Sequence, residues 1–278
     1  MLEVRNIEKS YQRKVVLDKV SFSAAPGQCV GIAGHNGSGK STLLSIIAQV
    51  LRPDGGEVLF NEGVDEVADK VAGNSDVSGD TGKSAGAVPV MPVMPVMPVI
   101  PVIPGYVPQE NSLLEDLSVK ETLDFWLRVY GLPVKDLFTP SSPATMLGLG
   151  EIRKARVAKL SGGMRKRLSV AIALLSRSSL LLFDEAFTAL DRAYRLELEA
   201  YVVDFCKKGG CVLYCSHDIK ELLDLCERII VLRQGQKIFD DAVSRFPDEA
   251  AALDFLLNPD SAIPIGSPAS RESGSDRL

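Results

Sequence analysis

The chain has 278 residues, 46% apolar and 24% charged, a composition that is typical of a soluble globular protein and excludes overall disorder. A net charge of −5 and a pI near 5.3 leave no basic footprint for nucleic acid and argue against electrostatic docking on anionic lipid. The five cysteines lack CxxC spacing, which favours reduced thiols in a cytosolic protein, and two histidines argue against a histidine-based metal site. Glu3 and Arg5 stand where a signal peptide has its apolar stretch, so export by that route is not expected.

Four zones follow one another along the chain. Residues 1–61 alternate strand-like segments with a Gly-rich loop and one helix, residues 62–104 are of low complexity, and residues 105–258 return to globular patterning. The last zone, residues 259–278, is rich in Ser, Pro and Gly and is expected to be disordered. The first and third zones together are long enough for one well-buried α/β domain.

The globular zones show the alternation of an α/β protein. The first 25 residues predict two antiparallel hairpin strands, LEVRNI and VVLDKVSFSA. Short apolar runs at Gln28–Ala33, Leu180–Phe183 and Cys211–Cys215 predict buried strands, and Lys40–Val50 predicts a helix. This order favours a mostly parallel sheet covered on both faces.

The segment from Ala87 to Tyr106 has no charged residue, but its prolines prevent a membrane-spanning helix because each removes a backbone donor. Proline recurs there at every third residue, as Pro89, Pro92, Pro95, Pro98, Pro101 and Pro104. This period matches polyproline II and predicts an apolar rod about 50 Å long that loops out near Gln109. Two interpretations stay open: a low-complexity expansion tolerated at a surface loop, or a docking strip for an aromatic-lined groove on a partner.

The run GHNGSGKS at residues 34–41 matches the pattern G-x-x-x-x-G-K-[ST], between a predicted strand and a predicted helix. Glycines let backbone amides wrap phosphate groups, and the helix N-terminus adds the positive end of its dipole. We expect Lys40 to reach the β- and γ-phosphates of a nucleotide and Ser41 to hold Mg²⁺. The alternative is a glycine-rich turn that only caps a helix. The nucleotide-binding residues predicted in this region are Gly34, Asn36, Gly37, Ser38, Gly39, Lys40, Ser41 and Thr42.

The run LLLFDE at residues 180–185 is an apolar strand that ends in two carboxylates. A buried strand delivers its terminal acid to the carboxyl edge of the sheet, where the phosphate loop also lies. Asp184 is expected to bind Mg²⁺, directly or through water, and Glu185 to activate an attacking water as general base. The alternative is a solvated strand end, where two acids are common.

The run LSGGM at residues 160–164 places a serine N-cap and two glycines before the helical segment RKRLSVAIALLS. Such a start presents bare amides at a second helix N-terminus. The alternative is an ordinary capped helix, although Gly162 and Gly163 weaken a helix start for no evident structural gain.

These motifs resemble those of the nucleotide-binding subunit of an ABC transporter, over about residues 1–240. In that family LSGG is the signature sequence, which faces the γ-phosphate held by the other subunit of a head-to-tail dimer. The resemblance therefore adds Ser161, Gly162 and Gly163 to the nucleotide-binding residues. It also implies an α/β fold: a P-loop NTPase (RecA-like) core with an N-terminal antiparallel β subdomain and an ABC α-helical subdomain.

The resemblance assigns four further residues. Tyr11 matches the aromatic residue that stacks on adenine, and Gln109 matches the Q-loop glutamine that contacts Mg²⁺ and the attacking water. Asp191 matches the loop that communicates between the two sites, and His217 matches the switch histidine that contacts the γ-phosphate. Each alone has a plainer interpretation: a surface turn residue, an exposed loop amide, a helix N-cap and a hydrogen-bonded histidine at a strand end.

The resemblance divides the chain into an ATPase domain over 1–240, with its helical subdomain about 110–168, and a C-terminal helical segment over 241–258. Two departures from the family stand out. Ala186 replaces the proline often found after the catalytic glutamate, and the insert 62–104 lengthens the spacing from Lys40 to the glutamine.

The helical subdomain is expected to begin a helix at Ser118, where Glu121 completes a capping box. In the family, the groove beside this helix receives the coupling helix of a membrane subunit. The candidate groove residues are Leu113, Leu114, Phe125 and Trp126, and the plainer alternative for each is a place in the core of the subdomain.

The resemblance implies an ATPase with Glu185, His217 and Gln109 as catalytic residues, and Ser41, Gln109 and Asp184 as ligands of Mg²⁺. It implies two composite sites in a dimer, for which a homodimer suffices and a heterodimer stays open. The expected partner is an integral membrane permease, in a complex of exporter type on the cytoplasmic face of the cell membrane. We expect neither nucleic-acid binding nor direct membrane insertion. The alternatives are a soluble ABC ATPase acting as a mechanical switch and a regulatory protein with a silent site.

Overall fold

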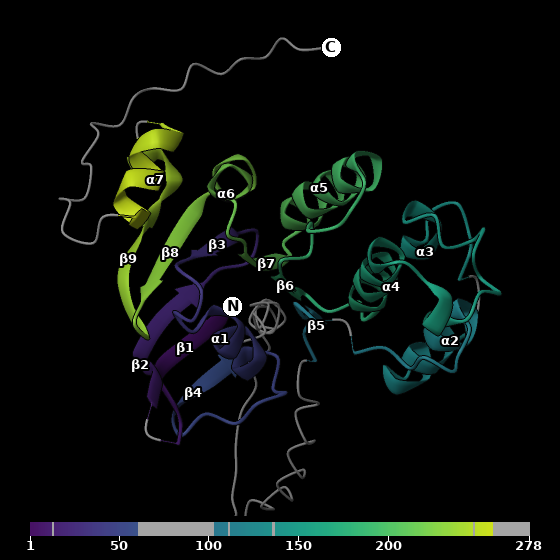
Figure 1. Cartoon of the computed structure of the whole chain (residues 1–278), viewed down its shortest axis with the longest axis horizontal. Coiled ribbons are helices and arrows are strands. Elements are labelled where there is room, and N and C mark those ends of the chain that lie inside the picture. Colours follow the sequence, from purple (N-terminus) through teal and green to yellow (C-terminus); the bar gives the residue numbers. More distant parts are fainter. Residues whose placement is uncertain (13, 61–102, 111, 135–136, 247, 258–278) are drawn as a thin grey trace, which may run out of the picture. The chain divides into compact units, whose positions relative to one another are not determined.

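The structure is a computed structural model that describes residues 1–60 and 103–257, apart from residues 13, 111, 135–136 and 247 (Figure 1). Of the insert predicted over 62–104, only the last two residues fall within this part, so the predicted rod lies outside it. The predicted tail over 259–278 also lies outside the described residues.

The N-terminal strands form a three-stranded antiparallel sheet in the order β2-β1-β4. The strands are β1 (Leu2–Tyr11), β2 (Lys14–Ala24) and β4 (Gly55–Phe60). Leu2 stands opposite both Ala24 and Phe60, so β1 is the central strand. The predicted hairpin is confirmed, and both of its strands are longer than the apolar pattern indicated.

A second, six-stranded sheet has the order β5-β6-β7-β3-β8-β9. Its first five strands are parallel, and β9 runs antiparallel to β8. The three strands predicted from apolar runs are confirmed. The strands of this sheet are β3 (Cys29–Ala33), β5 (Gly105–Val107), β6 (Leu180–Asp184), β7 (Cys211–Cys215), β8 (Arg228–Arg233) and β9 (Gln236–Ala242).

Strands β3, β6 and β7 are buried at every residue, on both faces of the sheet, which explains why they read as continuous apolar runs. In β6, Leu180 and Leu182 belong to one hydrophobic cluster, whereas Leu181 and Phe183 belong to the other. The first cluster includes the buried apolar residues of the N-terminal sheet and of α1 (Lys40–Ile47). The second contains the residues of the helices α4 (Gly162–Leu175), α5 (Arg192–Lys207) and α6 (Ile219–Leu225).

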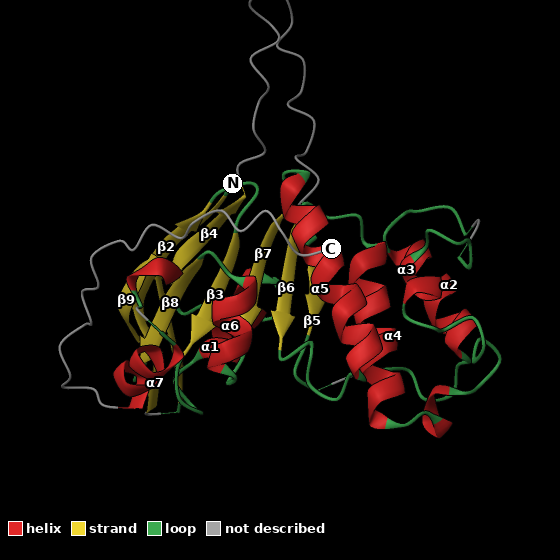
Figure 2. Ribbon diagram, turned by 90° about the horizontal axis from the view of Figure 1, so that it is seen from above, coloured by secondary structure: helices red, strands yellow, loops and turns green. Residues whose placement is uncertain are grey.

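The helices α2 and α3 pack beside α4, on its side away from the strands (Figures 1 and 2), and a 3₁₀ helix precedes α4 in the chain. These helices are α2 (Val119–Val129), α3 (Pro143–Met146) and the 3₁₀ helix η1 (Val157–Lys159). The predicted capping box is confirmed, because Ser118 accepts from the amide of Glu121 and the Glu121 carboxylate accepts from the amide of Ser118. Of the candidate groove residues, Leu113 and Trp126 pack on the core, whereas Leu114 and Phe125 are exposed.

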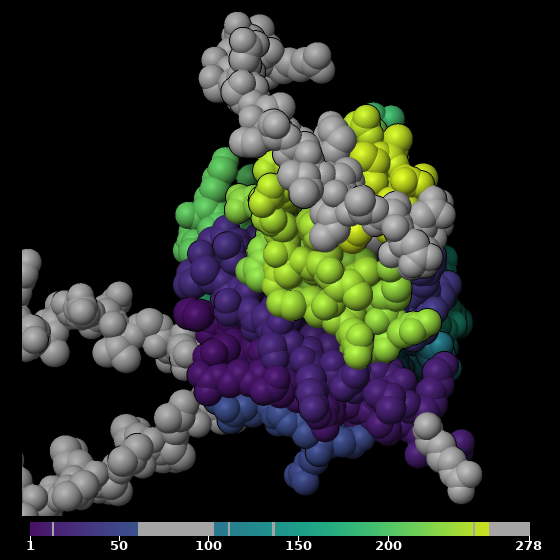
Figure 3. Space-filling model, turned by 90° about the vertical axis from the view of Figure 1, so that its left-hand side faces the viewer, coloured from purple at the N-terminus to yellow at the C-terminus, as the bar shows by residue number. Residues whose placement is uncertain are grey.

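The chain ends its described part with η2 (Val243–Arg245) and α7 (Glu249–Leu257), while Asp241 and Ala242 still belong to β9. Phe239, Phe246 and Phe255 form an aromatic cluster between β9 and α7. The N-terminal strands and the β8–β9 hairpin share one face of the molecule (Figure 3). Among the described residues, no helix combines the length and the apolar character needed to cross a membrane.

Candidate active site

Two glycines of the phosphate loop, Gly34 and Gly39, are required both by their backbone conformation and by close packing. Gly34 and Gly39 have φ of 147° and 105°, in the region that favours glycine. A Cβ atom on Gly34 would lie 2.3 Å from the carbonyl oxygen of Leu232, and one on Gly39 would lie 2.7 Å from that of Val16. The loop between β3 and α1 is therefore pressed against β8 and β2.

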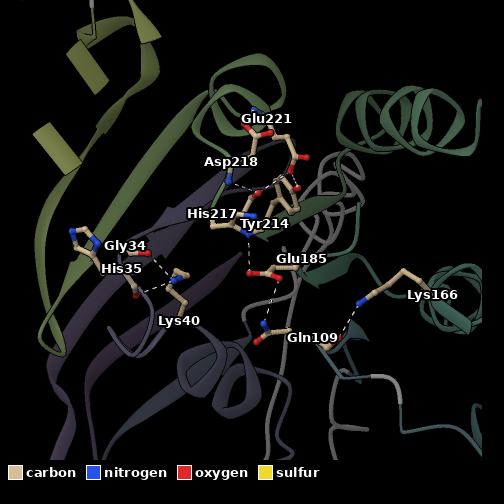
Figure 4. A network of polar contacts seen from close by, with 11 residues as sticks. Gly34, His35, Lys40, Gln109, Lys166, Glu185, Tyr214, His217, Asp218 and Glu221 are labelled. Carbon is tan, nitrogen blue, oxygen red and sulfur yellow. Dashed lines mark hydrogen bonds and ion pairs between the residues drawn. The ribbon is translucent and has the colours of Figure 1, made fainter. Parts of the chain in front are cut away.

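Lys40 is held inside this loop. It is 8% exposed, and its ammonium group donates to the backbone oxygens of Gly34 at 2.7 Å and His35 at 3.1 Å (Figure 4). Within the described chain, no carboxylate forms an ion pair with Lys40. The loop thus holds a buried cation and the free amides at the start of α1, which together suit an anionic group.

Asp184, the last residue of β6, is 2% exposed and lies next to this loop. Burial raises the pKa of its carboxyl, and the Glu185 carboxylate raises it further, against the opposing effects of a Ser41 hydrogen bond and of Lys40. Its Oδ2 atom has no hydrogen-bond partner among the described residues. A buried carboxylate oxygen left open beside a serine hydroxyl matches the oxygen ligands that Mg²⁺ prefers.

The carboxylate of Glu185 lies between an amide and an imidazole. Gln109 Nε2 donates to its Oε2 at 3.4 Å, and His217 Nδ1 lies 3.1 Å from its Oε1 (Figure 4). These residues follow β5, β6 and β7, which are consecutive neighbours in the sheet, so parallel pairing brings them to one edge. Glu185 itself has a left-handed φ of 53°, which is rare outside glycine and concentrated at functional sites.

A cavity of about 630 Å³ joins the phosphate loop to this edge of the sheet. It brings together most of the residues predicted for nucleotide, metal and catalysis. Lys14 and Val16 of β2 also line it, although their residue types gave no signal in the sequence. Its lining is Tyr11, Lys14, Val16, Asn36, Gly37, Gly39, Lys40, Ser41, Thr42, Gln109, Asp184, Glu185 and His217.

Two predicted loop residues lie just outside this cavity. Gly34 lines an adjacent cavity of about 420 Å³, together with His35, Asn36 and His217. Ser38 is 4% exposed, and its hydroxyl has no hydrogen-bond partner within the described chain. Gly34 and Ser38 pack against each other within the loop, since a Cβ on Gly34 would lie 2.6 Å from the Ser38 hydroxyl.

The residues of the LSGG motif and Asp191 do not line the cavity of their own chain. Ser161 is the N-cap of α4 and accepts from the amide of Met164 at 3.3 Å, while Asp191 precedes α5. The expectation that both glycines lack a structural role is wrong for one of them. A Cβ on Gly163 would lie 2.6 Å from the carbonyl oxygen of Ala189, whereas Gly162 has open space around it.

Lys166 on α4 is a site residue that the sequence motifs missed. It is 5% exposed, and its ammonium group donates to the backbone oxygens of Pro108 and Gln109, both at 3.1 Å (Figure 4). Burial lowers the pKa of Lys166, against the opposing charges of Asp184 and Glu185. Its position inside a basic surface-like run, MRKR, hides this role in the sequence.

Comparisons with known proteins agree with this geometry. The family model described as "ABC transporter" matches residues 17–188. The linearmycin resistance ATP-binding protein LnrL of Bacillus subtilis (strain 168) is 30% identical, covering 86% of this chain and 68% of its own length. The Nod factor export ATP-binding protein I of Paraburkholderia xenovorans (strain LB400) is 31% identical, covering 87% and 71%. A dimeric post-hydrolysis structure of the ATP-binding cassette MJ0796 with ADP and Pi has a TM-score of 0.64 at 23% identity, covering 87% and 99%.

A phosphate loop next to a strand that ends in two acidic residues, at the carboxyl edge of a parallel sheet, defines a P-loop nucleotide hydrolase. The chain belongs to the ABC transporter family, as an ATP-hydrolysing subunit that powers transport. The predicted fold class and ATPase activity are confirmed. The alternative of a soluble mechanical switch is not favoured by these relatives.

Proposed function

We propose that ATP binds on the loop of residues 34–42 and is hydrolysed where Gln109, Glu185 and His217 meet. The observation that carries this proposal is the carboxylate of Glu185, which lies 3.1 Å from His217 and 3.4 Å from Gln109 in the wall of the cavity. A general base needs such a position, within hydrogen-bond reach of a water beside the γ-phosphate.

Lys40 and Tyr11 mark the two ends of the bound nucleotide in this proposal. Lys40 carries the buried charge that would face the β- and γ-phosphates, in place of the two backbone oxygens that it now contacts. Tyr11 is 48% exposed and lines the same cavity, so its ring could stack on adenine, although Lys9 Nζ lies over it at 5.8 Å from the centroid.

Ser41, Asp184 and Gln109 would hold Mg²⁺ through their side-chain oxygens. The open Oδ2 atom of Asp184 and its Ser41 neighbour support this assignment. When bound, the ion supplies positive charge to the phosphate oxygens.

Hydrolysis needs a water oxygen to attack the γ-phosphorus in line while the bond to the β–γ bridging oxygen breaks. Glu185 takes the proton of this water on a carboxylate oxygen, and ADP leaves with the bridging oxygen. Gln109 orients the water, and His217 contacts the γ-phosphate while it holds the Glu185 carboxylate. Lys40 stabilises the charge that develops on the phosphate oxygens.

Ser161, Gly162, Gly163 and Asp191 would act on the nucleotide of a second subunit. Two observations support this: they lie outside the cavity of their own chain, and Ser161 and Gly162 are exposed at the start of α4. Each dimer would then contain two composite sites, each closed by the amides of the opposite α4. Because this chain carries both halves of a site, a homodimer is sufficient, and a heterodimer is the alternative.

We further infer that the chain drives export through a separate membrane permease, on the cytoplasmic face of the membrane. Two similar proteins are named for linearmycin resistance and Nod factor export. The exposed Leu114 and Phe125, near the start of α2 and on it, offer an apolar surface to such a partner. Co-purification of an integral membrane protein with the full chain tests this inference, and recovery of the chain without one would contradict it.

Nucleotide binding can be tested with Lys40→Ala, measured by titration calorimetry with ATP. The variant is expected to bind ATP on the order of 100-fold more weakly, because it loses a charge-assisted contact. Lys208→Ala is the matched control, since Lys208 lies at the end of α5, pairs with Asp204 of that helix, and has a side chain that is 73% exposed. Wild-type affinity in Lys40→Ala would remove the phosphate loop from the proposal.

A further inference from the structure

The turn after β7 exposes the side chain of His217 to solvent, whereas its neighbours Tyr214 and Ser216 are buried and hydrogen-bonded to Glu221. The His217 side chain is 62% exposed, whereas Tyr214 and Ser216 are fully or nearly fully buried. The hydroxyl groups of Tyr214 and Ser216 both donate to one oxygen, Oε2 of Glu221, with Ser216 at 2.7 Å. Figure 4 shows Glu221 on the side of this turn away from Glu185.

The other oxygen of Glu221 forms an ion pair with α5. Its Oε1 atom accepts from Arg195 Nη2 at 2.7 Å, and the Glu221 side chain is only 12% exposed. Arg195 also contacts Glu199 of its own helix at 3.1 Å, where both side chains reach solvent. The ion pair between Arg195 and Glu221 therefore joins α5 to α6. Because the Glu221 carboxylate is mostly buried, it needs several hydrogen-bond and ion-pair partners to offset its desolvation.

Ser216 links Glu221 to the backbone on the far side of His217. Its hydroxyl oxygen accepts from the backbone amide of Asp218 at 3.1 Å while its proton goes to Glu221. His217 thus lies between Ser216 and Asp218, which are joined by the hydrogen bond from the Asp218 amide to the Ser216 hydroxyl. On its other side, His217 Nδ1 lies 3.1 Å from Glu185 Oε1.

A helix-capping role does not account for the Glu221 carboxylate. The cap of α6 is the side chain of Asp218, which accepts from the amides of Lys220 at 2.9 Å and Glu221 at 3.3 Å. The Glu221 carboxylate instead points to β7 and α5, and all three of its side-chain donors lie outside α6.

We propose that Glu221 is a positioning residue for His217: through Ser216 it fixes the turn after β7 against α5, and so holds the imidazole at Glu185. This inference rests on the proposed role of His217 in hydrolysis. Without the carboxylate, Ser216 loses its acceptor, the turn moves, and the imidazole leaves Glu185. ATP affinity is expected to change little, because the Glu221 carboxylate bonds to Tyr214, Ser216 and Arg195 and does not line the cavity that contains the phosphate loop.

The test compares steady-state ATP hydrolysis of Glu221→Ala, Ser216→Ala and the double variant of the full chain. Each single variant is expected to lower kcat at least about tenfold with KM within twofold of wild type, because displacement of a catalytic group costs rate rather than binding. The double variant is expected to be no slower than Glu221→Ala, since both changes break one route. Glu221→Gln, which keeps an oxygen for Ser216, is expected to recover most of kcat.

Two matched variants separate positioning from folding. Tyr214→Phe removes one donor to Glu221 but leaves Ser216 in place, and Glu199→Ala removes only the solvent-side partner of Arg195. Both are expected to keep kcat within twofold of wild type. A loss of kcat in Tyr214→Phe equal to that of Ser216→Ala would overturn the route through Ser216.

The chain contains two histidines, so imidazole-labelled NMR gives a direct readout of His217. In Glu221→Ala the His217 resonance is expected to shift or broaden while that of His35 stays in place; unchanged resonances would overturn the proposal. His217→Ala distinguishes the two levels of inference. If it hydrolyses ATP at the wild-type rate, the proposed role of His217 fails; if it is inactive while Glu221→Ala is fully active, only the positioning role fails.

Discussion

The ammonium group of Lys166 lies 3.1 Å from the backbone oxygen of Gln109 and equally close to that of Pro108. Lys166 belongs to α4, the helix that begins with the LSGG motif, whereas Gln109 follows β5 and faces Glu185. The contact therefore ties the backbone of one proposed catalytic residue to the helix that would close the site of a second subunit.

Replacement of Lys166 by methionine keeps the apolar stem and removes these two hydrogen bonds. We expect kcat for ATP to fall about tenfold with unchanged ATP affinity, because Gln109 loses its backbone anchor. The control is Lys154→Met, which removes an exposed charge from the same part of the chain. Equal kcat values for the two variants would show that Lys166 serves packing alone.

The two glycines of the LSGG motif are expected to differ in stability tests. Gly163→Ala should lower the free energy of unfolding by about 1–3 kcal/mol, because its Cβ would stand 2.6 Å from the carbonyl oxygen of Ala189. Gly162→Ala meets open space and should leave stability unchanged or slightly raised. Denaturant unfolding of the nucleotide-free chain measures both, and equal destabilisation would contradict the close approach to Ala189.

Ser161 is expected to matter only in the dimer. Ser161→Arg should leave ATP binding to the monomer intact, because Ser161 lies outside the cavity of its own chain, and should abolish dimerisation with ATP. Light scattering of the Glu185→Gln/Ser161→Arg double variant measures this. ATP-dependent dimers that persist in it would mean that α4 does not close the site.

Deletion of residues 66–103 is expected to leave basal ATPase activity and thermal stability nearly unchanged. Within the described part of the chain, the six-stranded sheet and both hydrophobic clusters are complete with residues up to 60 and from 105 onward. Activity and melting temperature of the deletion variant test this expectation. A collapse of either property would show that the insert packs into the core.

Much of the fold was predictable because its signals are local. The strand before Gly34, the strand that ends at Asp184 and the capping box at Ser118 each depend on residues close together in sequence. The predicted helix over 40–50 ends earlier, at Ile47, since Gln49 turns the chain with a φ of 60°.

Long-range contacts account for what the sequence did not reveal. Lys166 looks like one charge of a basic run, and only the fold buries it against Pro108 and Gln109. Val16 lines the cavity because β2 packs on Gly39, and Gly163 is required by the carbonyl oxygen of Ala189. None of these neighbours is close in sequence, so no spacing rule marks them.

In the proposed mechanism, Glu185 activates the water that hydrolyses ATP. Glu185→Gln keeps the size of the side chain and an oxygen that can accept from Gln109, but it removes the carboxylate that acts as the base. The most direct measurement combines ATP turnover with light scattering of this variant at saturating ATP. We predict normal ATP binding, turnover slowed at least about 100-fold and an accumulated ATP-bound dimer. Near-wild-type turnover in Glu185→Gln would contradict the account.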